Sequence, residues 1–377
     1  MDFNFTEEQR MLLDAARRFL AREYGFERRR AILASADGYS REVWQGLADL
    51  GLLALNIPEE HGGLGGSMID TMLAMNVAGE TLLLEPYLAS AVVATRALAR
   101  QASDAQCAEL LPTMASGEKI AILAHDEPAS RFDRMAIETR AWRLGNGYVL
   151  SGHKSAVAHL PCADILLVTA RLAVSDTAQP GPLALFALPR ATEGVRRLAW
   201  PMVDGTHAGE LWLEQAFVPA TALVGHADAE AVIEQALDAG LAAVCAEAVG
   251  ALDRLLAATV EYARTRQQFG VPIGKFQALQ HRMADMVLHV EQARSISYLA
   301  AVRCTDPDAS ARRRTLAAAK VTIGQACRFV GQQAVQLHGG MGVTDELDVG
   351  HYFKRLMAIE QQFGSTDHHL ESYAALL

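Results

Sequence analysis

The chain has 377 residues, with 34 basic and 44 acidic side chains and a formal net charge of −10. Binding to nucleic acid requires a basic surface, so we expect no nucleic-acid partner. With 51% hydrophobic and 21% charged residues the whole chain can fold, and its length predicts two or three domains.

The cysteines and the apolar segments indicate the compartment. Five cysteines lie far apart in the sequence, which argues against a disulfide framework and against a zinc site. The first eight residues include three acidic side chains and no basic one, whereas a secretory signal begins with a basic segment. The most apolar long stretch, residues 236–258, contains four charged side chains and is not expected to span a membrane. We therefore expect a cytoplasmic protein without a membrane segment or a bound metal.

Hydrophobic periodicity predicts helices in the first third of the chain. Thr6 and Gln9 fit a capping box at the start of the first helix. Further helices are expected over about residues 67–85, 88–101 and 105–115.

The pattern changes near residue 118. Apolar runs become short and are bounded by Gly, Pro and Asp, and Gly145-Asn146-Gly147 is typical of a hairpin turn. This segment predicts a small antiparallel sheet or barrel. From residue 228 the apolar residues again recur at helical spacing, including a stripe from Leu316 to Val330, which predicts a helical bundle.

The predicted fold class is therefore mostly α-helical with a central β-domain. We expect an N-terminal helical domain over residues 1–117, a middle β-domain over 118–227 and a C-terminal helical bundle over 228–377. No Gly-x-Gly-x-x-Gly segment joins a predicted strand to a helix, so a Rossmann nucleotide site is not indicated.

Two segments of the predicted bundle carry a far more specific pattern: residues 264–277 (RTRQQFGVPIGKFQ) and 333–344 (QAVQLHGGMGVT). Together they resemble the signature regions of the acyl-CoA dehydrogenase family, in which the helical, β and helical domains follow the same order. Residues 245–251, 349–355 and 363–370 are similar to the small subunit of pimeloyl-CoA dehydrogenases. The resemblance covers essentially the whole chain. It implies an FAD-dependent oxidoreductase of fatty acid degradation, which desaturates an acyl-CoA thioester and passes electrons to an electron-transfer flavoprotein.

The signature residues suit a dinucleotide. Arg266 and Phe269 are three residues apart and are expected on one helix face, where a guanidinium could neutralise a pyrophosphate and a ring could cover adenine or ribose. Gln277 follows just beyond a turn. Gln336 offers a donor and an acceptor. The cofactor-binding set is completed by two glycines that admit a bulky ligand, Gly339 and Gly340. The resemblance implies that these positions hold the FAD bound to a neighbouring subunit.

The positions of the family's catalytic base are altered. The base most often precedes the Gly of a Tyr-Glu-Gly-Thr motif, where this chain has Phe363, and a second family position falls on Gly240. Neither residue can accept a proton. Glu247, two helical turns after Gly240, and Glu360 are candidates for a relocated base. Glu247 is equally compatible with a buried carboxylate paired with an arginine, which is the interpretation we favour.

The segments that would face the flavin depart from the pattern as well. Relatives carry Trp-x-Thr after a Gly-x-Lys turn, whereas this chain has Ala156 and Ala158. Phe132 replaces a serine in the loop that begins Glu127-Pro128, and Asp367 replaces a glutamine near the FAD phosphates. By the resemblance, the altered positions belong to the chain's own active site, whereas the retained ones complete a neighbour's site.

Three hypotheses remain open, and no catalytic residue is assigned. In the first, the chain is a catalytically depleted small subunit of a heterotetramer that completes the FAD site of a catalytic large subunit. Its substrate would be a dicarboxylyl-CoA such as pimeloyl-CoA. In the second, the chain is a complete homomeric dehydrogenase, for example a homodimer, with Glu247 as its base. In the third, it is a non-catalytic scaffold subunit.

Overall fold

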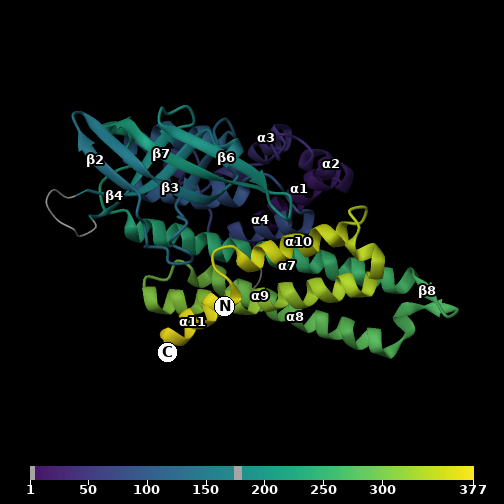
Figure 1. Ribbon diagram of the computed structural model, residues 1–377. Coiled ribbons are helices and arrows are strands. Elements are labelled where there is room, and N and C mark those ends of the chain that lie inside the picture. Colours follow the sequence, from purple (N-terminus) through teal and green to yellow (C-terminus); the bar gives the residue numbers. More distant parts are fainter. Residues whose placement is uncertain (1–4, 174–180) are drawn as a thin grey trace. The chain divides into compact units, whose positions relative to one another are not determined.

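The computed structural model describes residues 5–173 and 181–377 (Figure 1). The first four residues of the acidic N-terminal segment therefore lie outside the described part of the chain. Spatial proximity divides the chain into two units, and both are discontinuous in sequence. Unit 1 comprises Met1–Arg29, Met68–Leu83 and Leu241–Leu377, and unit 2 comprises Arg30–Ser67 and Leu84–Gly240. The three domains expected from the sequence stay a prediction.

Unit 1 is built from helices. The Thr6 hydroxyl accepts from the Gln9 N–H and the Gln9 side chain accepts from the Thr6 N–H, so the predicted capping box is confirmed. The helices are α1 (Glu7–Glu23), the start of α2 (Phe26–Leu33), α4 (Met68–Thr81), most of α7 (Glu230–Thr265), α8 (Gln277–Arg303), α9 (Ala309–His338), α10 (Asp348–Gln361) and α11 (Thr366–Ala375). Between them lie β8 (Gln267–Gln268), β9 (Val271–Pro272), and the 3₁₀ turns η6 (Ile273–Lys275) and η7 (Gly339–Val343).

Helix α9 is at the centre of the C-terminal bundle. It packs against α8, α10 and α11, and the predicted stripe from Leu316 to Val330 is buried on it. Helix α4 ends at Thr81, earlier than the expected residue 85, because Leu82 adopts a left-handed conformation with φ of 53°. A left-handed residue after the last helical residue stops the helix.

Two glycines let α4 and α7 approach closely. A Cβ added to Gly79 would lie 1.9 Å from the carbonyl oxygen of Glu247, and one added to Gly250 would lie 1.9 Å from that of Asn76. Neither position can hold a larger residue without separating the helices. The backbone that carries Glu247 is thus held against α4.

Unit 2 contains the central sheet. Its strands are β1 (Ala121–Ala124), β2 (Arg140–Leu144), β3 (Gly147–Ala158), β4 (Ile165–Leu172), β5 (Leu183–Pro189), β6 (Val195–Pro201) and β7 (His207–Pro219). The order is β1-β4-β2-β3-β7-β6, and β5 also pairs with β4. The predicted turn at Gly145-Asn146 is confirmed, because Leu144 pairs with Gly147 across a two-residue loop.

The sequence predicts an antiparallel sheet or barrel. The observed sheet is instead partly parallel, and the described strands do not close into a barrel. Strands β1 and β2 both run parallel to β4, β1 beside its first half and β2 beside its last two residues. Strand β6 pairs only with β7 within the described residues and forms an open edge. Alternating hydrophobicity identifies strands but carries no information on their relative direction.

Helices complete unit 2. Besides the end of α2 and the start of α7, they are α3 (Arg41–Asp49), η1 (Leu52–Ala54), η2 (Glu59–His61), η3 (Tyr87–Ala94), α5 (Thr95–Gln101), α6 (Asp104–Ala115), η4 (Leu160–Cys162) and η5 (Ala220–Ala222). The helix expected over residues 88–101 is a π-helix, η3, that continues as α5. The predicted class of helices, then a sheet, then helices along the chain is confirmed. No helix within the described residues has the length and apolarity needed to cross a bilayer.

Candidate functional site

The first signature segment forms a hairpin. Helix α7 ends at Thr265, and strands β8 and β9 follow it in antiparallel pairing. Phe269 and Gly270 form the turn with φ of 52° and 78°, the pair of left-handed residues that a type I′ turn requires. The expectation that Arg266 and Phe269 share a helix face is therefore wrong, because the helix ends one residue before Arg266.

Phe269 is an unusual residue for this turn. Bulky side chains are disfavoured in the left-handed region, which Asn, Asp and Gly occupy more readily. The ring is nevertheless 92% exposed, and among the aromatic rings of residues 5–173 and 181–377 it contacts only the edge of Phe276, at a centroid distance of 6.0 Å. Strained residues that gain no burial concentrate at binding sites. This geometry favours a ligand-contact role for Phe269.

Side-chain contacts bring the two signature segments to one end of unit 1. Tyr262 in the last turn of α7 stacks on His338 at the end of α9, with ring centroids 4.3 Å apart. Arg282 of α8 donates to the amide oxygen of Gln333 of α9 at 3.1 Å. The β8–β9 hairpin extends from this end of the bundle (Figure 1).

Three polar side chains at this end are free to bind a ligand. Arg266, Gln277 and Gln336 are exposed, and their side chains make no hydrogen bond or ion pair within the described residues. Open space surrounds Gly339 and Gly340, since an added Cβ would meet no atom within 4 Å. A guanidinium and two amides beside an open backbone suit an anion that also has hydrogen-bonding edges.

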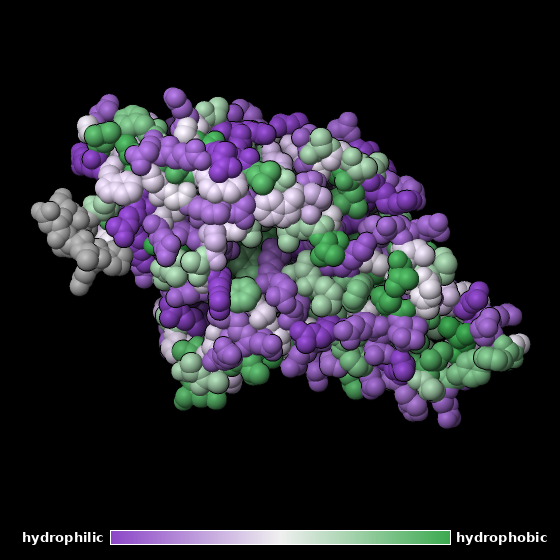
Figure 2. All heavy atoms as spheres, viewed as in Figure 1, coloured by the Kyte–Doolittle hydropathy of each residue, from purple (hydrophilic) through white to green (hydrophobic). Residues whose placement is uncertain are grey.

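Apolar side chains adjoin these donors. Phe269, Val271 and Phe276 are exposed, and Figure 2 shows apolar surface at the end of unit 1 where Figure 1 labels β8. A charged donor set beside exposed rings matches the pyrophosphate and adenine portions of FAD. This end of the chain therefore fits one part of an FAD site.

The segment at the family's first base position is held by buried contacts. Lys320 Nζ donates to the carbonyl oxygens of Glu360 and Gly364 at 2.8 and 2.7 Å. The N–H and hydroxyl of Thr366 donate to the Glu360 carboxylate at 3.1 and 2.8 Å, and Arg328 pairs with it at 3.2 Å. Burial raises the pKa of Glu360, but these hydrogen bonds outweigh it and hold the pKa below its usual range. Glu360 is thus engaged on every side.

Neither family base position offers a proton acceptor. Phe363 has φ of 60°, and its carbonyl oxygen lies 2.9 Å from Nε2 of His369. Gly240 lies in the interior of α7 and has no side chain.

Glu247 is buried and paired. Arg355 Nε and Nη2 lie 2.6 and 2.8 Å from the two carboxylate oxygens, which makes the pair bidentate. The side chain of Glu247 is 6% exposed and that of Arg355 is 13% exposed. Arg355 also donates to the amide oxygen of Gln362 at 3.3 Å. Both oxygens of the carboxylate thus face a guanidinium. The paired arrangement favoured from the sequence is thus the one observed.

The flavin-facing segments of unit 2 lack the groups that would contact a flavin ring. Ala156 has φ of 52° at a bulge where the β3–β7 register shifts, and Ala158 ends β3. Phe132 is 40% exposed. Methyl groups supply neither an aromatic screen nor a hydroxyl donor. This part of the chain does not fit the isoalloxazine of FAD.

Unit 2 also contains a buried charge cluster that the sequence did not predict. Lys154 is fully buried, and its Nζ donates to the His125 carbonyl oxygen, Glu127 Oε1 and Thr169 Oγ1 at 3.0, 2.6 and 3.1 Å. Burial lowers the pKa of Lys154 to about 8, against the opposing effect of Glu127. The available signal was a lysine inside an apolar strand, two residues after Gly152. A strand can bury a lysine only if a carboxylate meets it.

The same cluster holds His125 in one tautomer. Nε2 lies 2.7 Å from the Arg134 carbonyl oxygen and must donate to it, so Nδ1, 3.0 Å from Thr169 Oγ1, accepts the hydroxyl proton. Burial, with the Lys154 charge, lowers the pKa of His125 to about 3. The ring is therefore neutral in the folded chain.

We expect acid to destabilise unit 2 through His125. Between pH 6.5 and 3 the unfolded chain binds a proton at this residue and the folded chain does not, so stability falls as the pH falls. From pH 7 to pH 5 this residue should lower the free energy of unfolding by about 2 kcal/mol. Urea unfolding at the two pH values measures this change in the free energy of unfolding. His125→Gln should remove the part of the pH dependence that comes from His125. All four tryptophans lie in unit 2, so their fluorescence reports on that unit.

The control is His281→Gln, since His281 is exposed on α8. This variant should keep the pH dependence of the wild-type chain. An equal pH dependence in His125→Gln and the wild-type chain would contradict the assignment.

Comparison with known proteins gives a consistent picture. A family model described as the acyl-CoA dehydrogenase C-terminal domain matches residues 230–377, and one described as the acyl-CoA dehydrogenase N-terminal domain matches residues 6–118. Acyl-CoA dehydrogenase IpdE2 of Mycobacterium tuberculosis is 30% identical over 350 residues, which are 93% of this chain and 91% of the relative.

Solved structures agree with these matches. The crystal structure of the ChsE4-ChsE5 complex from Mycobacterium tuberculosis is similar with a TM-score of 0.89 and 29% identity, over 100% of this chain and 98% of that chain. Butyryl-CoA dehydrogenase from Megasphaera elsdenii is similar with a TM-score of 0.88 and 25% identity, over 100% and 99%. This chain belongs to the acyl-CoA dehydrogenase family of FAD-dependent oxidoreductases that act on CH–CH bonds.

Proposed function

We propose that this chain is the small, catalytically depleted subunit of a heteromeric acyl-CoA dehydrogenase and completes the FAD site of a catalytic large subunit. The observation that carries the proposal is the contrast between two sets of residues. Arg266, Gln277 and Gln336 are present and exposed, and their side chains have no hydrogen-bond or ion-pair partner in the part of the chain that the structure describes. At the chain's own reaction site, Phe363 occupies the position of the family's base, and alanines occupy the positions of its flavin contacts.

A composite site explains why one set is kept without the other. In a homomer every FAD would face both sets, so losing the base and the flavin contacts would abolish every site at once. In a heteromer a different chain supplies those groups, and this chain needs only the residues that reach across the interface. Exposure of Arg266 and the Phe269 ring in the isolated chain agrees with contacts that a second subunit would cover.

FAD bound at such a composite site would supply the acceptor for the hydride that leaves the β-carbon of an acyl-CoA. This chain would contribute binding only. Arg266 would neutralise pyrophosphate charge, the amides of Gln277 and Gln336 would hydrogen-bond the cofactor, and Phe269 would cover its flat portion. The α-proton would be removed by the partner, because no free carboxylate lies at Phe363 or Gly240.

Substrate, electron acceptor and location follow the resemblance. We propose a dicarboxylyl-CoA such as pimeloyl-CoA as substrate and an electron-transfer flavoprotein as acceptor. The ChsE4-ChsE5 structure, a complex of two named chains, supports a heteromeric arrangement. All five cysteines are buried thiols, which supports a reducing compartment and therefore the cytoplasm.

The complete homomeric enzyme is the weaker alternative, because Arg355 occupies both oxygens of its proposed base, Glu247. A turnover assay separates the two. The tagged chain is purified alone and also from its native cells with whatever binds it, and oxidation of pimeloyl-CoA is followed with an artificial electron acceptor. We expect no turnover by the chain alone and turnover by the complex. Turnover by the chain alone would overturn the proposal.

A further inference from the structure

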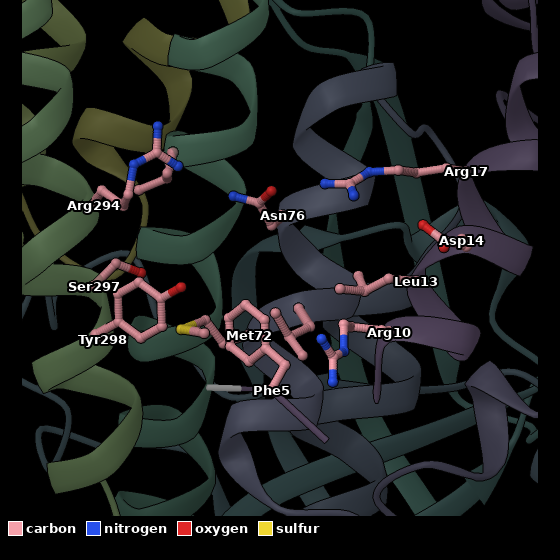
Figure 3. Close-up of a pocket in the computed structure, with 12 residues that line it drawn as sticks. Phe5, Arg10, Leu13, Asp14, Arg17, Met72, Asn76, Arg294, Ser297 and Tyr298 are labelled. Atoms are coloured by element: carbon pink, nitrogen blue, oxygen red, sulfur yellow. The ribbon is translucent and has the colours of Figure 1, made fainter. Parts of the chain in front are cut away.

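A cavity of about 300 Å³ lies in unit 1, away from the signature segments, between α1, α4, α7 and α8 (Figure 3). This volume is at the lower end of the range for small-molecule sites. The cavity has an apolar side formed by Leu13 of α1, Met72 and Leu73 of α4, and Val249 of α7. Leu13, Met72 and Leu73 are themselves buried. The cavity can therefore take an apolar body.

One polar group inside the cavity has no partner. Ser297 of α8 is 3% exposed, it lines the cavity, and its hydroxyl makes no hydrogen bond within the described residues. A buried hydroxyl without a partner costs about 1–3 kcal/mol. Native structures satisfy such groups with water or a ligand. Ser297 is thus a hydrogen-bonding group for whatever fills the cavity.

The charges at the rim distinguish one arginine from two others. Arg17 pairs with Glu80 at 2.6 Å. Arg294 pairs with Asp253 at 2.6 Å. Arg10 makes no hydrogen bond or ion pair through its side chain within the described residues.

Arg10 lies at the apolar end of the cavity. Figure 3 shows it extending from α1 toward the side lined by Phe5 and Met72. Phe5 and Tyr298 stack there, with ring centroids 6.1 Å apart. Asp14, one turn further along α1, also lines the rim and acts on Arg17. Arg10, which has no partner among the described residues, therefore lies beside an apolar wall.

We propose that this cavity binds a small amphiphilic monocarboxylate, with its carboxylate on Arg10, its apolar body against Leu13, Met72 and Val249, and a hydrogen bond to Ser297. A second carboxylate is disfavoured, because Arg17 and Arg294 are already paired. A ligand cation is disfavoured too, because it would be repelled by Arg10, the arginine at the rim that has no partner within the described residues. The proposal rests on residues outside the FAD contacts and stands independently of the proposed function.

Octanoate is the probe, and octanamide is its neutral counterpart. Binding to the full chain is measured by ligand-observed NMR. We expect octanoate to bind more tightly than octanamide. Arg10→Gln should weaken octanoate binding about threefold to fivefold, the effect of losing an exposed ion pair. The same variant should leave octanamide binding unchanged. Arg18→Gln is the matched control, because Arg18 is exposed on the same helix and does not line the cavity.

Ser297→Ala provides a second and different readout. Removing an unpartnered buried hydroxyl should raise the melting temperature of the unliganded chain, whereas octanoate binding should weaken about fivefold. Binding that Arg10→Gln and Ser297→Ala both leave unchanged would place octanoate elsewhere, for example in an acyl site, and would overturn the proposal. Absence of binding, or equal binding of octanoate and octanamide, would overturn it as well.

Discussion

Replacing Arg266 with alanine is expected to strip FAD from the heteromeric complex, although Arg266 lies on the chain that performs no chemistry. Once the interface forms, the guanidinium is covered and pairs with the cofactor's pyrophosphate. Its removal leaves a buried charge unpaired, at a cost of about 2–5 kcal/mol. FAD should therefore bind at least about thirtyfold more weakly. Equilibrium dialysis of the purified complex against free FAD measures this.

A neighbouring arginine provides the control for this experiment. Arg264 is exposed two residues earlier, on the last turn of α7. Arg264→Ala should leave FAD affinity within about threefold, the effect of one exposed charge. If Arg266→Ala retains FAD as tightly as Arg264→Ala does, this end of the chain does not contact the cofactor.

Glu247→Gln is expected to unfold unit 1 more readily and to leave turnover of the assembled complex unchanged. The substitution leaves Arg355 largely buried, with its bidentate partner replaced by a neutral amide. Breaking a buried ion pair by removing one charge costs about 3–5 kcal/mol. Urea unfolding followed by circular dichroism gives the loss. Turnover is measured at a temperature where the variant is folded.

The catalytic-base hypothesis predicts the opposite result. Loss of a general base lowers turnover by two or more orders of magnitude and has little effect on stability. Glu261→Gln is the control, since Glu261 is exposed on the same helix and should change neither quantity. A double variant, Glu247→Leu with Arg355→Met, should regain part of the lost stability, because an apolar pair can replace a buried ion pair. Lost turnover with unchanged stability in Glu247→Gln would contradict the structural role.

The sequence predicts the fold to the level of its elements. The Thr6 capping box, the turn at Gly145-Asn146 and the stripe from Leu316 to Val330 were each predictable, because local spacing determines them. The parallel pairing of β1 and β2 with β4 was not, because strand direction depends on connections rather than on alternation.

The site was predictable in part, for the same reason. The motif around Arg266 could be identified, but its conformation could not, because Phe269 adopts a left-handed turn that a helical count does not anticipate. Buried charges were missed where each partner is distant in sequence. Lys154 of β3 meets Glu127 of the loop that follows β1, and Lys320 meets carbonyl groups about forty residues away. Such pairs follow from tertiary contacts and leave only one trace in the sequence, a lysine among apolar residues.

The half-site account is tested most directly by counting FAD per chain. The isolated chain and its native complex are each purified, and bound FAD is released and quantified against protein. The account predicts far less than one FAD per chain for the isolated protein and one FAD per pair of unlike subunits for the complex. One tightly held FAD per subunit in the isolated chain, together with oxidation of acyl-CoA, would contradict it.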